Sequence, residues 1–313
     1  MNRRDLISKL LAESVSLSGA ILCSSCGTLA KKTRQNAKRS APKQIFRPQR
    51  ESSAQPETQT KIGQNQSYTT LSNDYLNKTA NFDRDHPEDL FISQEKLKLL
   101  FSCNHKLKNC EKYVGYGNFN LLCFDQFVHQ CKRIPKMEPL SKKELEFLEE
   151  TFYFNAFKYG FYGKKVTTNI TNKIKRKEVI KIPQSGHYLF KEASLPIYKH
   201  IQQDIGDSII LTSGVRSVVK QMRLFLSKTI SVEGNLSKAS RSLAPPGHSY
   251  HAIGDFDVGK RGFGAFNFTD KFSSTSEYKK LTQLGYVEIR YPTENPFGVR
   301  FEPWHIEGSQ RQS

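Results

Sequence analysis

The sequence predicts an α+β fold: a small antiparallel sheet with flanking helices, preceded by a helical segment and a disordered N-terminal tail. Residues 31–85 are rich in Gln, Ser, Thr, Asn and Lys and show no apolar periodicity, so they cannot bury enough apolar surface to offset their ordering entropy. Residues 86–164 contain a clear helical repeat of apolar residues. Over residues 165–308, short β-type runs alternate with turns and helices, which predicts the core domain; residues 309–313 are expected to be a tail.

The first 30 residues resemble an export signal. An arginine pair, Arg3-Arg4, precedes a weakly apolar stretch, and small residues end it at Ala30. This pattern is typical of a bacterial twin-arginine signal, so we expect an exported protein of the periplasm or cell envelope. An ordinary amphipathic helix is the alternative, because Glu13 interrupts the apolar run. Lipid attachment at Cys23 or Cys26 is a minor variant.

Half of the net positive charge lies in the first 50 residues. Residues 1–50 hold eleven Lys and Arg against two acidic residues, a net +9 of the total +18. Such a basic arm is expected to contact an anionic cell surface, or else to act as a solvated tether over residues 31–85. Nucleic-acid binding is not expected, because the charge is concentrated in the tail and no helix-turn-helix or RNA-binding motif is present.

Four cysteines follow the expected signal: Cys103, Cys110, Cys123 and Cys131. In an oxidising compartment they predict either two disulfides, with three pairings open, or free buried thiols. A metal site is disfavoured, because no two of them are spaced as Cys-x2-Cys.

The clearest helix begins after Ser141, which forms a capping box with Glu144. Apolar residues such as Leu148 and Phe152 then recur on one face, and Gly160 marks the expected end.

The core domain contains three expected strands and two expected helices. The strands are "SIILTSG" (208–214), "YVEIRY" (286–291) and "VRFEPWHI" (299–306), and the helices lie at 216–228 and 276–284.

Two separated segments contain the residue types of a zinc hydrolase, which needs three His or Asp/Glu ligands, an open position and a nearby carboxylate. They are "SYHAIGDFD" (249–257) and "EPWH" (302–305). Side chains three apart, such as Glu302 and His305, diverge on an ideal strand. Pro303 must therefore break the strand so that both can face one metal.

Three pieces, in this order, resemble the VanY-type zinc D-alanyl-D-alanine carboxypeptidases, within the wider group that includes lysostaphin-like endopeptidases and the hedgehog domain. "SGVRS" (213–217) is similar to the family's Ser-x-Tyr-Arg-Ser, and "SYHAIGDFD" (249–257) to its Ser-x-His-x-x-Gly-x-Ala-x-Asp. "EPWH" (302–305) is similar to its Glu-x-x-His. The resemblance spans about residues 186–306 and implies a hedgehog-like or D-Ala-D-Ala-peptidase-like fold.

The resemblance also implies residue roles. His251, Asp257 and His305 would bind a zinc ion (Zn²⁺), and Glu302 would be the general base that takes a proton from the attacking water. By the same resemblance, two further residues bind substrate: Arg216 would hold its terminal carboxylate, and Ser249 would line the site or hydrogen-bond to it.

The sequence departs from the family pattern at two places. Only five residues separate His251 from Asp257, where the family has six, so His248 with Asp255, or His251 with Asp255, are alternative ligand pairs. We prefer His251 with Asp257, because Gly254 then matches the family's glycine. The other aspartate is a candidate for orienting a ligating histidine.

The second departure is Val215, which replaces the family's tyrosine and concerns substrate fit more than catalysis. The resemblance implies a carboxypeptidase that acts on D-alanine-terminated or related peptide stems of bacterial peptidoglycan. An endopeptidase and a non-catalytic zinc-binding cell-wall module are the alternatives. Glu302 argues against the latter, because a structural site does not need an unliganded carboxylate. D,D and L,D cleavage stay open.

Overall fold

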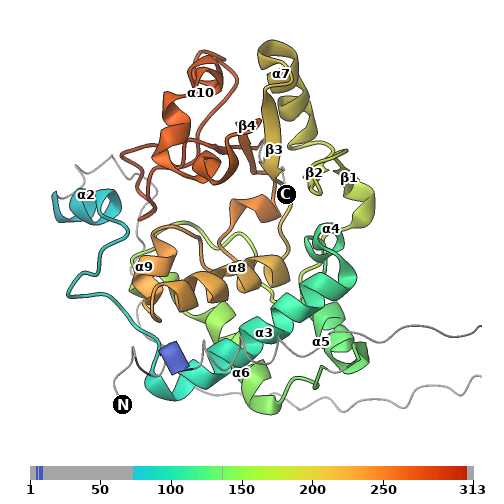
Figure 1. Ribbon diagram of the computed structural model, residues 1–313, viewed down its shortest axis with the longest axis vertical. Coiled ribbons are helices and arrows are strands. Elements are labelled where there is room, and N and C mark those ends of the chain that lie inside the picture. The colour runs from blue at the N-terminus through green and yellow to red at the C-terminus, as the bar shows by residue number, and fades with distance from the viewer. Residues whose placement is uncertain (1–4, 6, 10–72, 136, 309–313) are drawn as a thin grey trace, which may run out of the picture. The chain divides into compact units, whose positions relative to one another are not determined.

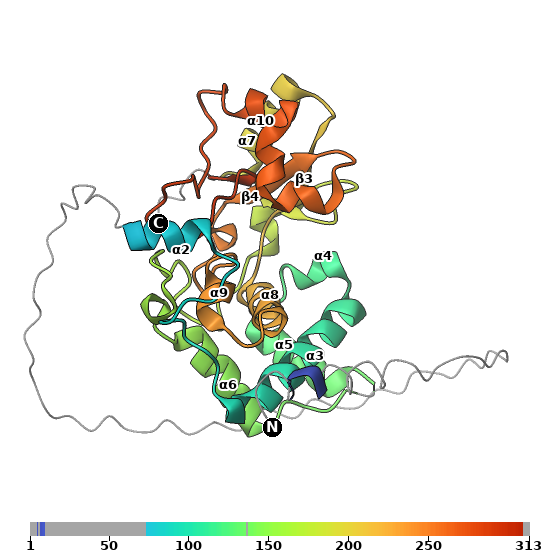
Figure 2. The same ribbon diagram turned by 60° about the vertical axis from the view of Figure 1, so that its left-hand side comes forward.

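The structure is a computed structural model that describes residue 5 and residues 7–9, 73–135 and 137–308, all within one compact unit (Figure 1). The expected α+β class is confirmed: helices accompany two small antiparallel sheets. In Figures 1 and 2 the strands β3 and β4 lie with helices α7 and α10, and helices α3, α5, α6 and α8 form a second group. None of the described helices has both the length and the apolar character needed to cross a membrane.

Only a small part of the N-terminal predictions concerns residues that the structure describes. The expected export signal, with Cys23 and Cys26, lies almost entirely outside the described residues, as does the tether up to residue 72. The end of the expected tether is ordered, which corrects the prediction: helix α2 spans Asn73–Ala80. The Tyr75 hydroxyl donates to the Asn295 carbonyl at 2.7 Å and accepts from the Gly298 N–H, so contacts with a distant loop hold this segment.

The expected helical segment forms helices α3 (Leu97–Val114), α4 (Tyr116–Phe119), α5 (Phe124–Arg133) and α6 (Lys142–Tyr153). Their apolar faces pack around helix α8 (Val218–Ser231), with Leu100, Leu107, Phe127, Leu148 and Met222 fully or almost fully buried. Helix α8 directly follows the strand that carries Ser213, so this packing fixes one wall of the site.

The expected capping box at the start of helix α6 is confirmed, but the helix ends before the predicted residue. The Ser141 hydroxyl accepts from the Glu144 N–H, and the Glu144 carboxylate accepts from the Ser141 N–H at 2.7 Å. The helix ends at Tyr153 rather than Gly160. The reason is local: the Asn155 side chain caps a separate 3₁₀ turn, and Gly160, with a φ of 80°, ends that turn instead.

The cysteines are free thiols, so the disulfide prediction is wrong and the alternative of buried thiols holds for Cys103, Cys110, Cys123 and Cys131. Each occupies a buried position on or beside the packed helices. Burial raises the pKa of Cys110 and of Cys131 to about 12, which keeps both thiols protonated and unreactive at neutral pH.

The functional sheet has the order β3-β4-β5, with β3 at Ile209–Ser213, β4 at Phe256–Lys260 and β5 at His305–Ile306, all antiparallel. Its register pairs Ser213 with Asp257 and Asp257 with His305. The register shifts between Leu211 and Ser213. Because paired residues on neighbouring strands lie side by side, this register brings distant parts of the chain to one point.

A second, two-stranded sheet pairs β1 (Val179–Lys181) with β2 (Tyr188–Phe190). The remaining helices are α7 (Leu195–Ile205), which packs on β3, α9 (Leu236–Ser240), and α10 (Ser276–Leu281).

Two strand predictions need correction. Residues 286–291 form no strand, although Ile289 makes one bridge to Ile306, and only the last two residues of 299–306 are strand. The following proline, Pro292, cannot donate to a sheet and ends the first run, and a turn at Pro303 interrupts the second. The strand at 208–214 and the helices at 216–228 and 276–284 are confirmed, with shifted ends.

Candidate metal and active site

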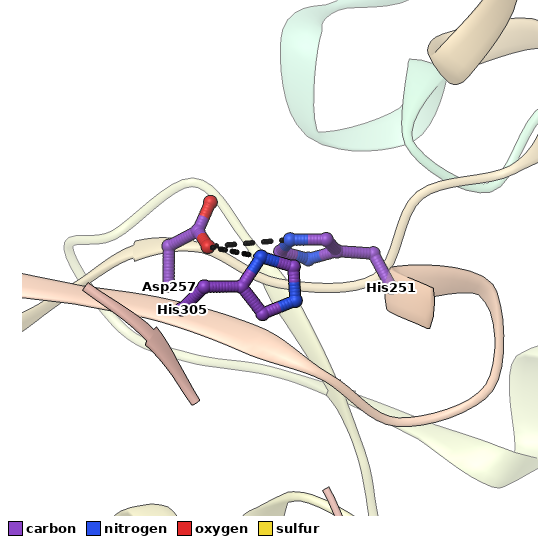
Figure 3. Close-up of side chains that lie close together, drawn as sticks. All are labelled: His251, Asp257 and His305. Atoms are coloured by element: carbon purple, nitrogen blue, oxygen red, sulfur yellow. Dashed lines mark ion pairs between the residues drawn. The ribbon is translucent and has the colours of Figure 1, made fainter. Parts of the chain in front are cut away.

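Three side chains from separate elements meet at the end of the functional sheet (Figure 3). His251 comes from the 3₁₀ turn Tyr250–Ala252, Asp257 from β4 and His305 from β5. Their exposed fractions are only 1%, 2% and 4%, and their potential ligand atoms all lie within 4.8 Å of one another. The structure therefore brings the three expected metal ligands together.

The distances single out one atom on each residue. His251 Nε2 lies 3.3 Å from Asp257 Oδ1, and His305 Nδ1 lies 3.6 Å from the same oxygen, as the dashed lines in Figure 3 mark. His251 Nε2 and Asp257 Oδ1 are both buried without a hydrogen-bond partner among the described residues. Burying such atoms unpaired is costly, and a divalent cation between them would satisfy both. Two imidazoles and a carboxylate also fit the ligands that zinc prefers.

Hydrogen bonds on the far side of each ring fix the orientation of both histidines. His251 Nδ1 is 2.8 Å from the Gly214 carbonyl oxygen, and His305 Nε2 is 3.0 Å from Asp255 Oδ2. These bonds leave His251 Nε2 and His305 Nδ1 facing Asp257. A side chain at Gly214 would overlap the Tyr188 carbonyl, so only glycine lets this backbone approach so closely.

Asp255 is held away from the cluster. Its carboxylate accepts two hydrogen bonds from Arg290, at 2.8 and 3.0 Å, and one from the Gly308 N–H at 3.0 Å. Burial alone would raise the pKa of Asp255, but its bonds with His305 and Arg290 hold that pKa well below the usual range. Asp255 thus stays ionised, and it orients His305 rather than facing the other ligand atoms.

The alternative histidine, His248, lies elsewhere. It is buried, its Nδ1 is 3.1 Å from the Gly163 carbonyl oxygen, and its ring packs edge-on against Phe161. The structure therefore does not bring His248 and Asp255 together as a ligand pair, and His248 has the contacts of a packed core histidine.

The cluster attracts positive charge. Burial opposes protonation of His305, but its bonds to Asp255 and Glu302 raise its pKa to about 9. Burial and the nearby Arg216 lower the pKa of His251. Burial would raise the pKa of Asp257, but His251 and Arg216 hold it far below its usual range. His305 therefore favours its protonated, positively charged form, and a bound metal ion would take the place of that proton.

Glu302 reaches the cluster through a tight turn. The His305 N–H donates to the Glu302 carbonyl at 3.1 Å, and this turn places Glu302 Oε2 3.1 Å from His305 Nδ1. The expected interruption of the strand at Pro303 is thus confirmed. A single backbone turn brings the carboxylate and the imidazole to the same side.

A cavity of about 190 Å³ opens beside the cluster. The residues expected to act on substrate line it together with others: Arg216, Gln221, Ser249, His251, Asp257, Tyr291, Arg300, Glu302, Trp304 and His305. Val215, at the family's tyrosine position, is instead buried against β1 and β2 and does not line this cavity.

Two of the three guanidinium nitrogens of Arg216 already donate hydrogen bonds to other residues of the protein. Its Nη2 donates to Asp257 Oδ2 at 2.6 Å and its Nε donates to Ser213 Oγ at 3.0 Å, which leaves Nη1 for a substrate. The arginine is fixed at the start of α8, where the next residue, Ser217, caps the helix by accepting from the Lys220 N–H.

Several residues that support the site are not among those predicted from the sequence. Arg290 clamps Asp255, and Tyr291 packs edge-on against His305 with ring centroids 4.9 Å apart. A charged residue inside the apolar run "YVEIRY" was a signal for a buried ion pair, because buried arginine needs a partner. Its partner, 35 residues away, could not be read from the sequence.

The region that contains this site is similar to known proteins. Residues 190–307 match the VanY family model, described as D-alanyl-D-alanine carboxypeptidase. A search of curated proteins found no match to the chain.

Three solved structures are similar to part of the chain. A structure of the LdcB LD-carboxypeptidase, described as revealing the molecular basis of peptidoglycan recognition, is 25% identical, has a TM-score of 0.37, and matches over 44% of this chain and 71% of that one. A mutant of the vancomycin resistance D,D-pentapeptidase VanY in complex with Zn(II) is 20% identical, with a TM-score of 0.31, over 46% and 86%. VanYB in complex with D-alanine-D-alanine is 23% identical, with a TM-score of 0.31, over 46% and 84%.

Proposed function

We propose that this chain is a zinc-dependent carboxypeptidase of bacterial peptidoglycan, as the match of residues 190–307 to the VanY family model of D-alanyl-D-alanine carboxypeptidases supports. Its substrates in this proposal are peptide stems that end in D-alanine or a related residue. The observation that carries the proposal is the pair of buried unsatisfied atoms, His251 Nε2 and Asp257 Oδ1, which lie in one cluster with His305.

The proposed zinc ligands are His251, Asp257 and His305. Three protein ligands with one open position are typical of catalytic zinc sites, whereas structural sites generally use four. When bound, zinc supplies Lewis acidity, which makes water a nucleophile near neutral pH and polarises a scissile carbonyl.

Glu302 is proposed as the general base and acid. Glu302 is a buried residue that lines the cavity, and its Oε2 lies 3.1 Å from the ligand atom of His305, so the carboxylate can reach a water beside the cluster. It would accept a proton from the attacking water and then deliver that proton to the leaving amine. A mobile surface carboxylate could not hold this position, but the turn at Pro303 fixes it.

Arg216 and Ser249 are proposed to bind the substrate, because both line the cavity next to the cluster. The remaining Nη1 of Arg216 would donate to the terminal carboxylate, and the buried hydroxyl of Ser249 would hydrogen-bond to the peptide. Arg216 would at the same time hold Asp257 Oδ2, which keeps Oδ1 directed at the histidines.

We further propose that the chain is exported to the periplasm or cell envelope, where peptidoglycan is found. The Arg3-Arg4 pair and the small residues before Ala30 support a twin-arginine signal. The basic stretch that follows would hold the enzyme near an anionic surface.

Incubation of the purified, zinc-loaded chain with two synthetic stems tests the proposed activity. One stem is a pentapeptide that ends in D-alanyl-D-alanine, and the other is the tetrapeptide with a single terminal D-alanine. Mass spectrometry is expected to show loss of one alanine from at least one of them, and this distinguishes D,D from L,D cleavage. A chelator should stop the release and added zinc should restore it. Zinc binding without release from either stem would favour the non-catalytic module, and release that survives metal removal would contradict the zinc mechanism.

A further inference from the structure

The cavity beside the cluster contains a second arginine, Arg300, which has no carboxylate partner in the part of the chain that the structure describes. Its Nη2 donates to the Phe268 carbonyl at 3.1 Å, and its Nε is buried without any hydrogen-bond partner there. Burial lowers the pKa of Arg300, and Glu302 and Asp270 favour its charge without forming an ion pair with it. Arg300 is therefore a charged group with unused hydrogen-bonding capacity at the active-site cavity.

Two aromatic rings hold this guanidinium in place. It lies 4.7 Å from the ring centre of Phe82 and 4.9 Å from that of Trp304. Cation–π contacts of this kind orient a planar guanidinium without using its N–H donors. A partly buried cation whose buried Nε–H has no acceptor is stabilised by an anion, so the arrangement favours binding of an external carboxylate.

Arg216 alone is poorly placed to clamp a carboxylate with two hydrogen bonds. Its Nε and Nη2 are used by Ser213 and Asp257, so one edge of the fork is occupied. A carboxylate has two oxygens that both need donors when it leaves water. A second arginine in the same cavity would supply the missing donors.

The chemistry of the proposed reaction indicates where the terminal carboxylate must lie. Glu302 gives a proton to the leaving amine, and in the leaving residue only the α-carbon separates that amine from the carboxylate. The carboxylate therefore lies close to Glu302. Arg300 and Glu302 are two residues apart in a non-helical segment and both line the cavity, whereas Phe301 between them packs against Tyr278.

We propose that Arg300 binds the C-terminal carboxylate of the substrate together with Arg216. This inference rests on the proposed function and deepens it, because a site that requires a free terminal carboxylate selects for removal of the last residue. Arg300 would then be a specificity-determining residue, and an amidated peptide end would bind poorly.

Fluorescence titration of the full, zinc-loaded chain tests this binding without any turnover. Trp304 is the only tryptophan of the chain and lies 4.9 Å from Arg300, so its emission should respond to a ligand at this point. The probes are N-acetyl-D-alanine and N-acetyl-D-alaninamide, which differ only in the carboxylate. The wild type should bind the acid more tightly, and Arg300→Gln should weaken acid binding by about 10- to 100-fold while leaving amide binding unchanged.

Arg133→Gln is the matched control, because Arg133 is exposed on α5 in the helical group; it should bind both probes as the wild type does. Circular dichroism shows whether each variant is folded. If Arg300→Gln does not fold, Arg300→Lys replaces it in the test. Lysine keeps the positive charge but lacks the planar pair of N–H donors of the guanidinium, so binding of the acid should weaken several-fold.

Unchanged preference for the acid in a folded Arg300 variant would overturn the inference, as would a wild type that binds acid and amide equally. Neither result depends on hydrolysis. Failure of the proposed function is detected separately, as absence of alanine release from the two stems.

Discussion

Glu302→Gln is expected to lower the rate of alanine release by about 10²- to 10⁴-fold, the usual contribution of a positioned general base, while zinc stays bound. The amide has nearly the same shape as the carboxylate but cannot accept the proton from water. The zinc ligands His251, Asp257 and His305 are unchanged in this variant. Single-turnover assays on the pentapeptide and tetrapeptide stems, with elemental analysis of the same samples, measure both quantities.

Glu294→Gln is the control for this substitution, because Glu294 is exposed and does not line the catalytic cavity. It should keep the wild-type rate. A normal rate in Glu302→Gln would show that another group accepts the proton. Loss of zinc together with activity would instead make Glu302 a metal ligand.

Asp255→Ala is expected to destabilise the fold by about 3–5 kcal/mol, because it removes the buried, doubly hydrogen-bonded partner of Arg290 and leaves that charge only its ion pair with Glu307. Asp255 is 2% exposed and Arg290 is 8% exposed, so water cannot take the place of the carboxylate. The free energy of unfolding in urea measures this loss. Asp125→Ala is the surface comparison: it removes an exposed ion pair with Lys173 and should change stability by less than about 1 kcal/mol.

Asp255→Asn separates orientation from stability. The amide keeps the size of the side chain but weakens the hydrogen bond that fixes the ring of His305 at 3.0 Å. Zinc affinity, measured by competition with a chromophoric chelator, is expected to fall by about 10- to 100-fold. If the folded Asn variant binds zinc like the wild type, Asp255 does not orient the ligand and serves only the ion pair with Arg290.

The sequence was sufficient to find the cluster because its residues lie in short motifs whose spacing determines local geometry. The turn at Pro303 that joins Glu302 to His305 is one such feature. The choice between Asp255 and Asp257 was harder, since residues two apart lie on the same face of a strand. In the structure Arg290 binds Asp255, which leaves Asp257 as the aspartate that faces the two histidines. The residues next to Asp255 in the sequence do not reveal this arginine, because it lies 35 residues away.

Other errors have similar causes. Helix α2 was expected to be disordered because its sequence is polar, but Tyr75 is held by the distant backbone of Asn295. The expected strand at 286–291 contributes a single bridge, since only two residues of β5 are available to pair. Cysteine counting suggested disulfides, yet four spaced thiols also fit as small apolar residues in a helical core. In each case tertiary contacts overrode the local pattern.

The central claim is that His251, Asp257 and His305 bind one catalytic zinc ion, and anomalous diffraction at the zinc edge from crystals of the purified chain tests it most directly. The account predicts a single strong peak at the cluster, about 2.0–2.2 Å from His251 Nε2, Asp257 Oδ1 and His305 Nδ1. Absence of a peak there from crystals grown with zinc, or zinc held by other side chains, would contradict it.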